Sequence, residues 1–163
     1  MPIEIPSGTI QFLTFHLDKE TYAFDIQKVK EVIDVTKITK VPRMPDYLLG
    51  AINLRGSVVP VIQLCGKFGL PAGEKTVDTC IIIVETDLSG ETITLGVMVD
   101  SIKEVLTLEK SMIDPPPRIG MRIHTGYIKG IGKKGNDFII LLDINRLMSE
   151  EAALKNAETV TEG

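Results

Sequence analysis

Few side chains in this sequence could perform chemistry, and their spacing does not combine them. The sequence has two histidines, His16 and His124, and two cysteines, Cys65 and Cys80. A catalytic histidine needs a nucleophile and an orienting group within reach, and a zinc site needs Cys and His at short fixed spacings. Neither arrangement occurs here. We therefore expect no enzyme activity, no cofactor and no metal.

One glycine-rich segment imitates a nucleotide site. Gly130-Ile131-Gly132-Lys133-Lys134-Gly135 fits the G-x-G-x-x-G pattern. In a dinucleotide site this loop joins a strand to a helix, and the N-terminus of the helix binds the pyrophosphate. A short apolar run, Phe138–Leu142, follows instead. The pattern therefore predicts a hairpin turn.

Composition excludes several classes of protein. The chain has 163 residues, a formal net charge of -4 and 44% hydrophobic residues, which suits one domain or two small subdomains with a real core. The sequence has no concentrated basic run of the kind that nucleic-acid backbones require. The longest apolar run, Cys80–Val84, is too short to span a membrane, and residues 1–6 do not resemble a signal peptide. We expect a cytoplasmic protein with reduced thiols.

The two halves of the sequence repeat the same order of segments. Lys30-Glu31-Val32 recurs as Lys103-Glu104-Val105, and each copy follows the pattern of an apolar hairpin. Further along, Tyr47–Gly50 matches Tyr127–Gly130. Matches in the same order predict two similar β-rich units.

The local patterns favour short strands joined by turns. Gln11–Leu17 has apolar residues on both faces, which predicts a strand that is covered on both sides. Pro42 and Pro45 predict an extended connection. Strands and turns at this spacing are typical of small barrels. Helix is expected only at Gln63–Phe68, where Gln63 could cap the first turn, and in a C-terminal stretch capped by Ser149.

A polar turn, Asn53-Leu54-Arg55-Gly56, separates two apolar runs in the first half. Arg55 carries a permanent charge on a planar fork of donors. A charged fork beside apolar surface is typical of a protein-binding edge.

These segments resemble the CheW family, the adaptors of bacterial chemotaxis arrays. The resemblance extends from about Gly8 to Met148 and rests on the order and spacing of its motifs. The motifs are Tyr22–Ile26, Val29–Ile33, the Pro42…Pro45 extension, the Gly50…Asn53-Leu54-Arg55-Gly56…Pro60 block, Gly96–Asp100, Thr125–Gly130 and Leu141–Asp143. One departure is Gln63, because the family usually carries Asp at this position.

The resemblance implies a mainly β fold with two SH3-like five-stranded β-barrel subdomains related by the pseudo-repeat, with short helices. We expect one CheW-like domain over residues 8–148. Subdomain 1 would cover about 20–75 with a closing C-terminal segment, and subdomain 2 about 79–144. Residues 149–163 would form a C-terminal helix and tail.

The resemblance also implies a function. The family links the cytoplasmic tip of a methyl-accepting chemoreceptor, a helical hairpin, to the regulatory domain of the histidine kinase CheA. We therefore expect a non-catalytic scaffold that is recruited to membrane-associated receptor arrays, without nucleic-acid binding or direct membrane insertion. An equivalent adaptor of another chemosensory pathway, such as twitching motility, is the alternative. A CheV-type protein is not expected, since the chain ends too soon for the receiver domain.

By position, the resemblance assigns two sets of binding residues. The groove that meets the receptor would include Leu13, Ile26, Val29, Glu31, Val32, Asn53, Arg55, Cys80, Gly96 and Val105. The kinase would contact Thr39, Val41 and Pro42. The apolar members are also residues that any barrel core needs, so groove and core both remain open for them. Glu31 and Arg55 could instead pair with each other.

Overall fold

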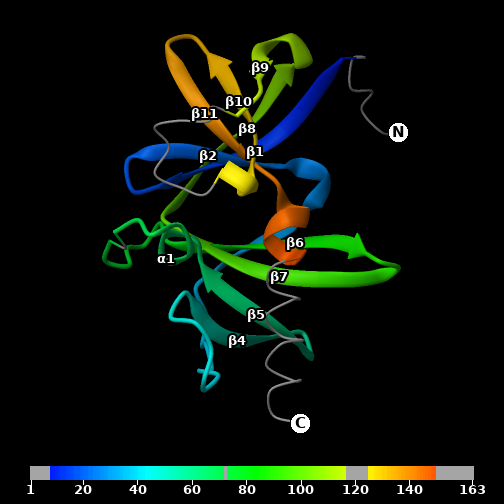
Figure 1. The fold of residues 1–163 in the computed structure, drawn as a ribbon. Coiled ribbons are helices and arrows are strands. Elements are labelled where there is room, and N and C mark those ends of the chain that lie inside the picture. The colour runs from blue at the N-terminus through cyan, green and yellow to red at the C-terminus, as the bar shows by residue number, and fades with distance from the viewer. Residues whose placement is uncertain (1–7, 72, 117–124, 150–163) are drawn as a thin grey trace.

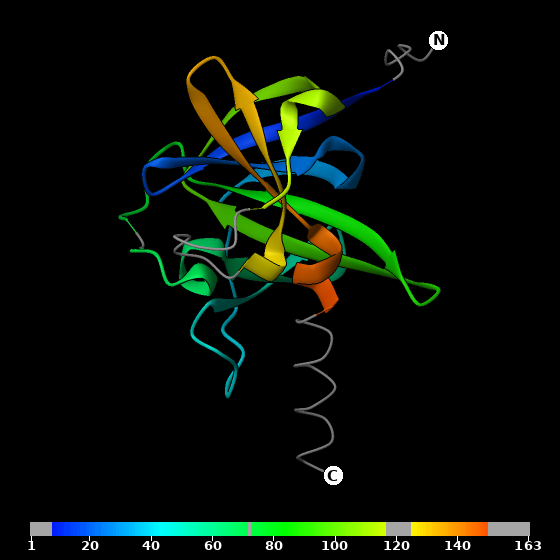
Figure 2. The same cartoon turned by 45° about the horizontal axis from the view of Figure 1, so that its top comes forward.

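The structure, a computed structural model, describes residues 8–71, 73–116 and 125–149, and within them the chain forms two sheets (Figure 1, Figure 2). Sheet A has the strand order β8-β1-β2-β11-β10-β9 and sheet B the order β3-β6-β7-β5-β4. The strands of sheet A are β1 (Thr9–Leu17), β2 (Glu20–Asp25), β8 (Ser101–Glu109), β9 (Ile113–Asp114), β10 (Ile128–Lys134) and β11 (Asp137–Leu142). Those of sheet B are β3 (Val29–Asp34), β4 (Leu48–Leu54), β5 (Ser57–Gln63), β6 (Cys80–Leu88) and β7 (Glu91–Val99).

Short helices connect these strands. They are the 3-10 helices η1 (Ile26–Lys28), η2 (Lys110–Met112) and η3 (Thr125–Tyr127), the α-helix α1 (Leu64–Phe68), and a helical stretch at residues 144–149. Among the described residues, no helix is long and apolar enough to cross a membrane.

The strand pairing repeats between the two sheets. Hairpin β4–β5 and hairpin β10–β11 have the same register, each with a bulge after its first pair. β5 then pairs in parallel with β7, as β11 does with β2. β9 adds two residues to sheet A, and the equivalent element of sheet B is the single bridge Thr39↔Ala51. The mainly β fold with two SH3-like units is confirmed, although sheet A has six strands rather than five.

The repeated tripeptide Lys-Glu-Val occupies equivalent positions at the edges of the two sheets. Val32 on β3 lies opposite Ile82, and Val105 on β8 lies opposite Leu13. In both strands the register shifts just before Glu, so that Lys30 and its counterpart Lys103 are the extra residues of a β-bulge. The predicted equivalence of the two segments is therefore confirmed.

The sheets do not follow the predicted subdomain boundaries of about 20–75 and 79–144. β6 and β7 pair with β3–β5, so sheet B is continuous from Val29 to Val99, while sheet A combines β1 and β2 with β8–β11. The first hairpin of the first repeat, β1–β2, therefore joins the later strands of the second repeat in sheet A. The first hairpin of the second repeat, β6–β7, joins the later strands of the first repeat in sheet B. The exchange follows from two short links, η1 after β2 and Asp100 after β7, which carry the chain from one sheet to the other.

The buried hydrophobic side chains of the described residues form three clusters. One fills the space between the sheets and is called the central core, and each sheet also has a core of its own. On β1, Phe15 packs in the central core and Phe12 in the core of sheet A. On β6, Ile82 packs in the central core and Ile81 in the core of sheet B. The predicted coverage of the first strand on both faces is confirmed. Each fully buried side chain of this size contributes roughly 1.5–3 kcal/mol.

The short helices start differently from the prediction. α1 begins at Leu64, but the Gln63 side chain makes no capping hydrogen bond, so the predicted cap is wrong. At the equivalent position Asp143 does cap the stretch 144–149, because its Oδ1 accepts a hydrogen bond from the Arg146 N–H at 3.1 Å. Ser149 lies within that stretch instead of capping a helix. A carboxylate can reach back to its own helix where the longer, neutral amide does not.

Candidate protein-binding surface

The edge strands β3 and β8 extend the faces that line the central core. Residues directly opposite each other in an antiparallel pair share a face, so Val32 lies on the same face as Ile82 and Val105 on the same face as Leu13. Ile82 and Leu13 are buried, whereas Val32 is 42% exposed and Val105 52% exposed. Both edge strands therefore present apolar surface that the fold itself does not cover.

Further partly buried residues join these exposed valines. Val29 and Ile26 pack against the central core beside Val32, and these three residues are called the β3 strip. Ile102, which packs against the central core in the same way, forms the β8 strip together with Val105. Ile102 was not among the predicted residues. The repeat alignment could have found it, since it is the counterpart of Val29.

An ion pair joins the turn of the β4–β5 hairpin to β3. Arg55 donates from Nη1 to Glu31 Oε1 at 3.2 Å and from Nη2 to Glu31 Oε2, a bidentate contact. Glu31 lies opposite Ile83, whose side chain belongs to the core of sheet B, so the pair lies on the other face of β3 from Val32. In sheet A, Lys134 at the end of β10 contacts Glu104, the counterpart of Glu31, at 3.5 Å. Both pairs therefore link a hairpin to the edge strand of its own sheet.

The geometry of the hairpin turn fixes where Arg55 points. Arg55 and Gly56 have φ values of 48° and 90°, as a two-residue hairpin turn of type I′ requires. The Asn53 side chain accepts a hydrogen bond from the Gly56 N–H at 2.8 Å and so fastens the turn. The hydrogen bond from Arg55 lowers the pKa of the Glu31 carboxyl, and Glu31 raises the pKa of Arg55. Both groups are therefore charged at neutral pH, and the Arg55 side chain is 65% exposed.

Three of the residues assigned to the receptor lie inside the protein. Leu13 and Cys80 belong to the central core, with 6% and 7% of their surface exposed. Gly96 is also buried, and a Cβ there would lie 3.0 Å from Val61 Cγ2. Leu13 and Cys80 therefore lie in the central core behind the strips, whereas the Cβ position of Gly96 faces Val61 and Ile81 of the core of sheet B.

The residues assigned to the kinase lie at the opposite end of sheet B from β3. Thr39 exchanges two backbone hydrogen bonds with Ala51 of β4, each 2.8 Å long. Gly50 makes this approach possible, because it has φ 142° and an added Cβ would lie 2.1 Å from the Thr39 carbonyl oxygen. Val41 and Pro42 follow and are exposed. The connection is thus anchored at its start and accessible beyond it, but the predicted extension is wrong, because residues 42–43 form a turn in which Arg43 has a φ of 63°.

The groups considered as candidates for chemistry do not form a metal-binding cluster or an ionised thiol within the described residues. The described residues contain no group of three or more His, Cys, Asp or Glu residues that could hold a metal ion. Burial raises the pKa of the Cys65 thiol to about 11 and also raises that of Cys80, so both thiols are protonated at neutral pH. His124 lies outside the described residues. The glycines from Gly130 onwards belong to the β10–β11 hairpin, which confirms the predicted turn.

Comparison with known proteins identifies the family. Residues 11–152 match the family described as CheW-like domain. The chain belongs to the CheW family. It is 35% identical to chemotaxis protein CheW of Klebsiella aerogenes over 86% of this chain and 82% of that protein. It is 32% identical to the Bacillus subtilis chemotaxis protein CheW over 94% of this chain and 95% of that protein.

A solved structure agrees with this result. The scaffolding protein TtCheW from Thermoanaerobacter tengcongensis is 37% identical in sequence, and its structure superposes with a TM-score of 0.75. The match covers 82% of this chain and 88% of that one. The fold and the sequence therefore indicate the same family of chemotaxis scaffolds.

Proposed function

We propose that this chain is a non-catalytic adaptor that couples the cytoplasmic tip of a chemoreceptor to the regulatory domain of the histidine kinase CheA. It would act in the cytoplasm, at membrane-associated receptor arrays. The observation that carries the proposal is the exposed apolar face of β3 beside a bidentate Arg–Glu pair, in a chain of the CheW family.

The β3 strip is the proposed receptor surface. An amphipathic helix is held by an apolar surface with charges at its rim. Val29 and Val32 would supply the apolar part. Glu31 and Arg55 lie on the other face of this edge strand and would supply charges to a partner that reaches around the edge of β3. Val105 would extend the contact through the β8 strip, while the buried residues behind the strips support their shape. The kinase would bind the accessible segment from Thr39 to Pro42, at the other end of sheet B.

Separate titrations with a receptor fragment and a kinase regulatory-domain fragment test this division. Val32→Asp should weaken receptor binding roughly tenfold or more, because it places a charge in an apolar contact. Val41→Asp should weaken only kinase binding. Val77→Asp is the matched control, since Val77 is 98% exposed and lies in neither surface. Equal losses for both partners, or a control as harmful as Val32→Asp, would refute the two-surface arrangement.

A further inference from the structure

The apolar face of the β3 strip ends at a carboxylate. Asp34 is the last residue of β3 and lies opposite Cys80, which belongs to the central core. Residues opposite each other in an antiparallel pair share a face, and so do residues two apart in one strand. Asp34 therefore lies on the same face of β3 as Val32, directly beyond the strip, and it is exposed.

The charge of Asp34 acts on the thiol at this end of the strip. Burial is the largest cause that raises the pKa of Cys80, and the negative charges of Asp34 and then Asp78 raise it further. Asp78 is an exposed residue that precedes β6 by two positions. The strand register and the effect on the thiol thus agree that the carboxylate of Asp34 lies on the core-facing side of β3.

The other charged residues of β3 already have partners within the fold. Lys30 Nζ lies 3.4 Å from Glu85 Oε2, and Glu31 binds Arg55 in the bidentate contact described above. Asp34 forms no ion pair and no side-chain hydrogen bond with any other described residue. Its charge is therefore available to a partner, whereas the charges of Lys30 and Glu31 stabilise the sheet.

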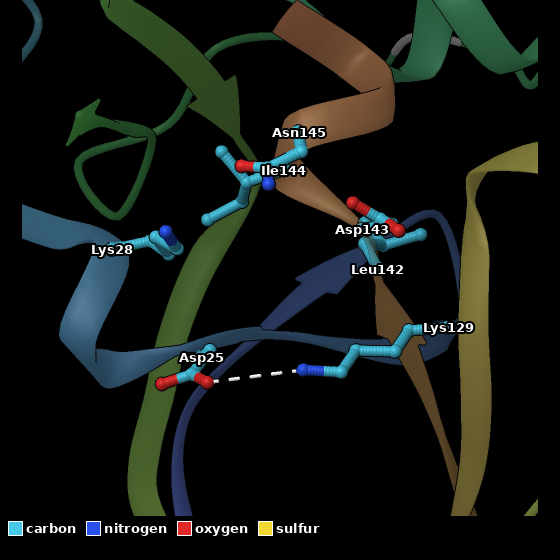
Figure 3. A pocket seen from close by; sticks show the side chains of 7 residues that line it. All are labelled: Asp25, Lys28, Lys129, Leu142, Asp143, Ile144 and Asn145. Atoms are coloured by element: carbon cyan, nitrogen blue, oxygen red, sulfur yellow. Dashed lines mark ion pairs between the residues drawn. The ribbon is translucent and has the colours of Figure 1, made fainter. Parts of the chain in front are cut away.

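The opposite end of the β3 strip carries balanced charges. Lys28, the last residue of η1, lines a polar pocket there (Figure 3). The other charged residues that line this pocket are Lys129, Asp25 and Asp143. Lys28 Nζ donates to Thr86 Oγ1 at 2.9 Å, and Lys129 Nζ lies 3.8 Å from Asp25 Oδ2. Two lysines thus face two carboxylates, and the strip is negative at one end only.

The fold itself does not need a carboxylate at position 34. Val32 corresponds to Val105 in the repeat, so the counterpart of Asp34 on β8 is Thr107. Thr107 lies opposite Gln11, whose Nε2 donates to Thr107 Oγ1 at 3.5 Å. The β8 strip therefore ends at neutral groups. The two strips share exposed apolar residues and differ in the charge at this end.

We propose that Asp34 binds a Lys or Arg side chain of the helical partner that docks on the β3 strip. The inference rests on the proposed function, because it adds a contact to the same surface. Two residues of a strand advance about 6.6 Å, and one helical turn advances about 5.4 Å. In a helix lying along β3, the residue one turn beyond the one that covers Val32 is therefore within reach of Asp34.

This contact also sets the direction of the docked helix. A helix whose apolar stripe ends at a basic residue gains the ion pair with Asp34 in one direction only. In the reverse direction the basic residue would lie beside the pocket at Lys28, where the charges are already balanced. Asp34 is thus a specificity-determining residue of the β3 strip, and the neutral Thr107 gives the β8 strip no such preference.

Asp34→Asn tests the contact, because it removes the charge and nearly preserves the shape of the side chain. It should weaken binding of the receptor fragment roughly fivefold, and added salt should reduce the difference from wild type. Asp137→Asn is the matched control, since Asp137 is an exposed carboxylate on the β10–β11 hairpin and lies in neither strip. Neither variant should change the melting temperature or the binding of the kinase fragment.

Basic residues of the receptor fragment are then changed one at a time to Gln. One of these changes should lose most of its effect when the protein already carries Asp34→Asn, and a fragment with Glu at that position should bind Asp34→Lys better than wild type. If Val32→Asp abolishes binding while Asp34→Asn matches Asp137→Asn, the contact is refuted and the proposed function stands. The contact is also refuted if Asp34→Asn weakens binding equally for every fragment. A wild-type protein that does not bind the fragment overturns both.

Discussion

Gly50→Ala tests how the kinase-assigned segment is held. An alanine Cβ at position 50 would lie 2.1 Å from the Thr39 carbonyl oxygen, and the φ of 142° is one that L-residues rarely adopt. The variant must separate Thr39 from Ala51, which loses two backbone hydrogen bonds of roughly 0.5–1.5 kcal/mol each. Backbone strain adds roughly 1–3 kcal/mol. We expect a total loss of roughly 2–6 kcal/mol of the free energy of unfolding.

Chemical unfolding and binding measured together separate a local from a global effect. For a domain of this size the melting temperature falls by about 2–4 °C per kcal/mol. Where the variant stays folded, kinase binding should fall more than receptor binding, because the Val41–Pro42 segment has lost its anchor. Gly130→Ala is the internal comparison, since its Cβ would lie 2.9 Å from the Asp114 carbonyl oxygen and its φ is not in the left-handed region. The reasoning fails if Gly50→Ala is no more destabilising than Gly130→Ala. It also fails if a folded Gly50→Ala variant loses receptor binding and kinase binding to the same extent.

Three further predictions follow from the charged turn and the thiols. Asparagine tolerates the left-handed conformation of the turn, so Arg55→Asn should keep the fold while weakening receptor binding roughly tenfold. The double variant Arg55→Glu with Glu31→Arg, which exchanges the two residues, should not restore binding in the same titration. Recovery would show that Arg55 acts only through Glu31. Because the pKa of Glu31 is lowered in the folded protein, its carboxylate stabilises the fold at pH values above its ordinary pKa of 4.5. This contribution is lost as the pH falls through the lower pKa of the folded state. The melting temperatures of wild type and Glu31→Gln should therefore differ at pH 7 and converge at acidic pH. Cys65 and Cys80 should react with a disulfide reagent at pH 8 only after unfolding, because burial keeps both thiols protonated; rapid reaction of the native protein would contradict this.

The sequence predicts the local elements well because their signals are local. The apolar residues of β1 and the turn residues Arg55 and Gly56 specify a strand and a hairpin without reference to the rest of the chain. The exchange of hairpins between repeats has no such signal, since a hairpin shows the same alternation in either sheet. Which sheet it joins depends on η1 and on Asp100, whose backbone N–H donates to the His16 carbonyl at 3.1 Å and whose side chain accepts from the Asp18 N–H at 2.8 Å.

The distinction between core and binding surface is non-local for the same reason. Leu13 and Val105 are direct cross-strand neighbours on one face, yet one is 6% exposed and the other 52% exposed. Only the position of β8 at the edge of the sheet separates them, and alternation does not report an edge. The polar pocket lined by Lys28, Lys129 and Asn145 is harder still to predict, because these residues come from three distant segments of the chain. The pairing of Glu31 with Arg55, in contrast, was one of two alternatives that the sequence left open.

The edges of the two sheets also indicate which kind of partner they accept. An unpaired edge strand invites another strand to add to the sheet unless bulges or charges prevent it. β3 and β8 both carry a bulge at the lysine of the repeated tripeptide, and Lys30 extends across to Glu85 at 3.4 Å. The bulge interrupts the backbone ladder that a new strand would need, while Val32 and Val105 remain exposed on the adjoining faces. An edge whose backbone ladder is broken but whose apolar face is intact is suited to side-chain contacts. A helix makes such contacts with its apolar stripe, whereas an added strand binds mainly through backbone hydrogen bonds. We therefore expect the proposed partner to be helical, and we expect replacement of the bulge lysine by Val to be the change that first makes the edge prone to strand pairing.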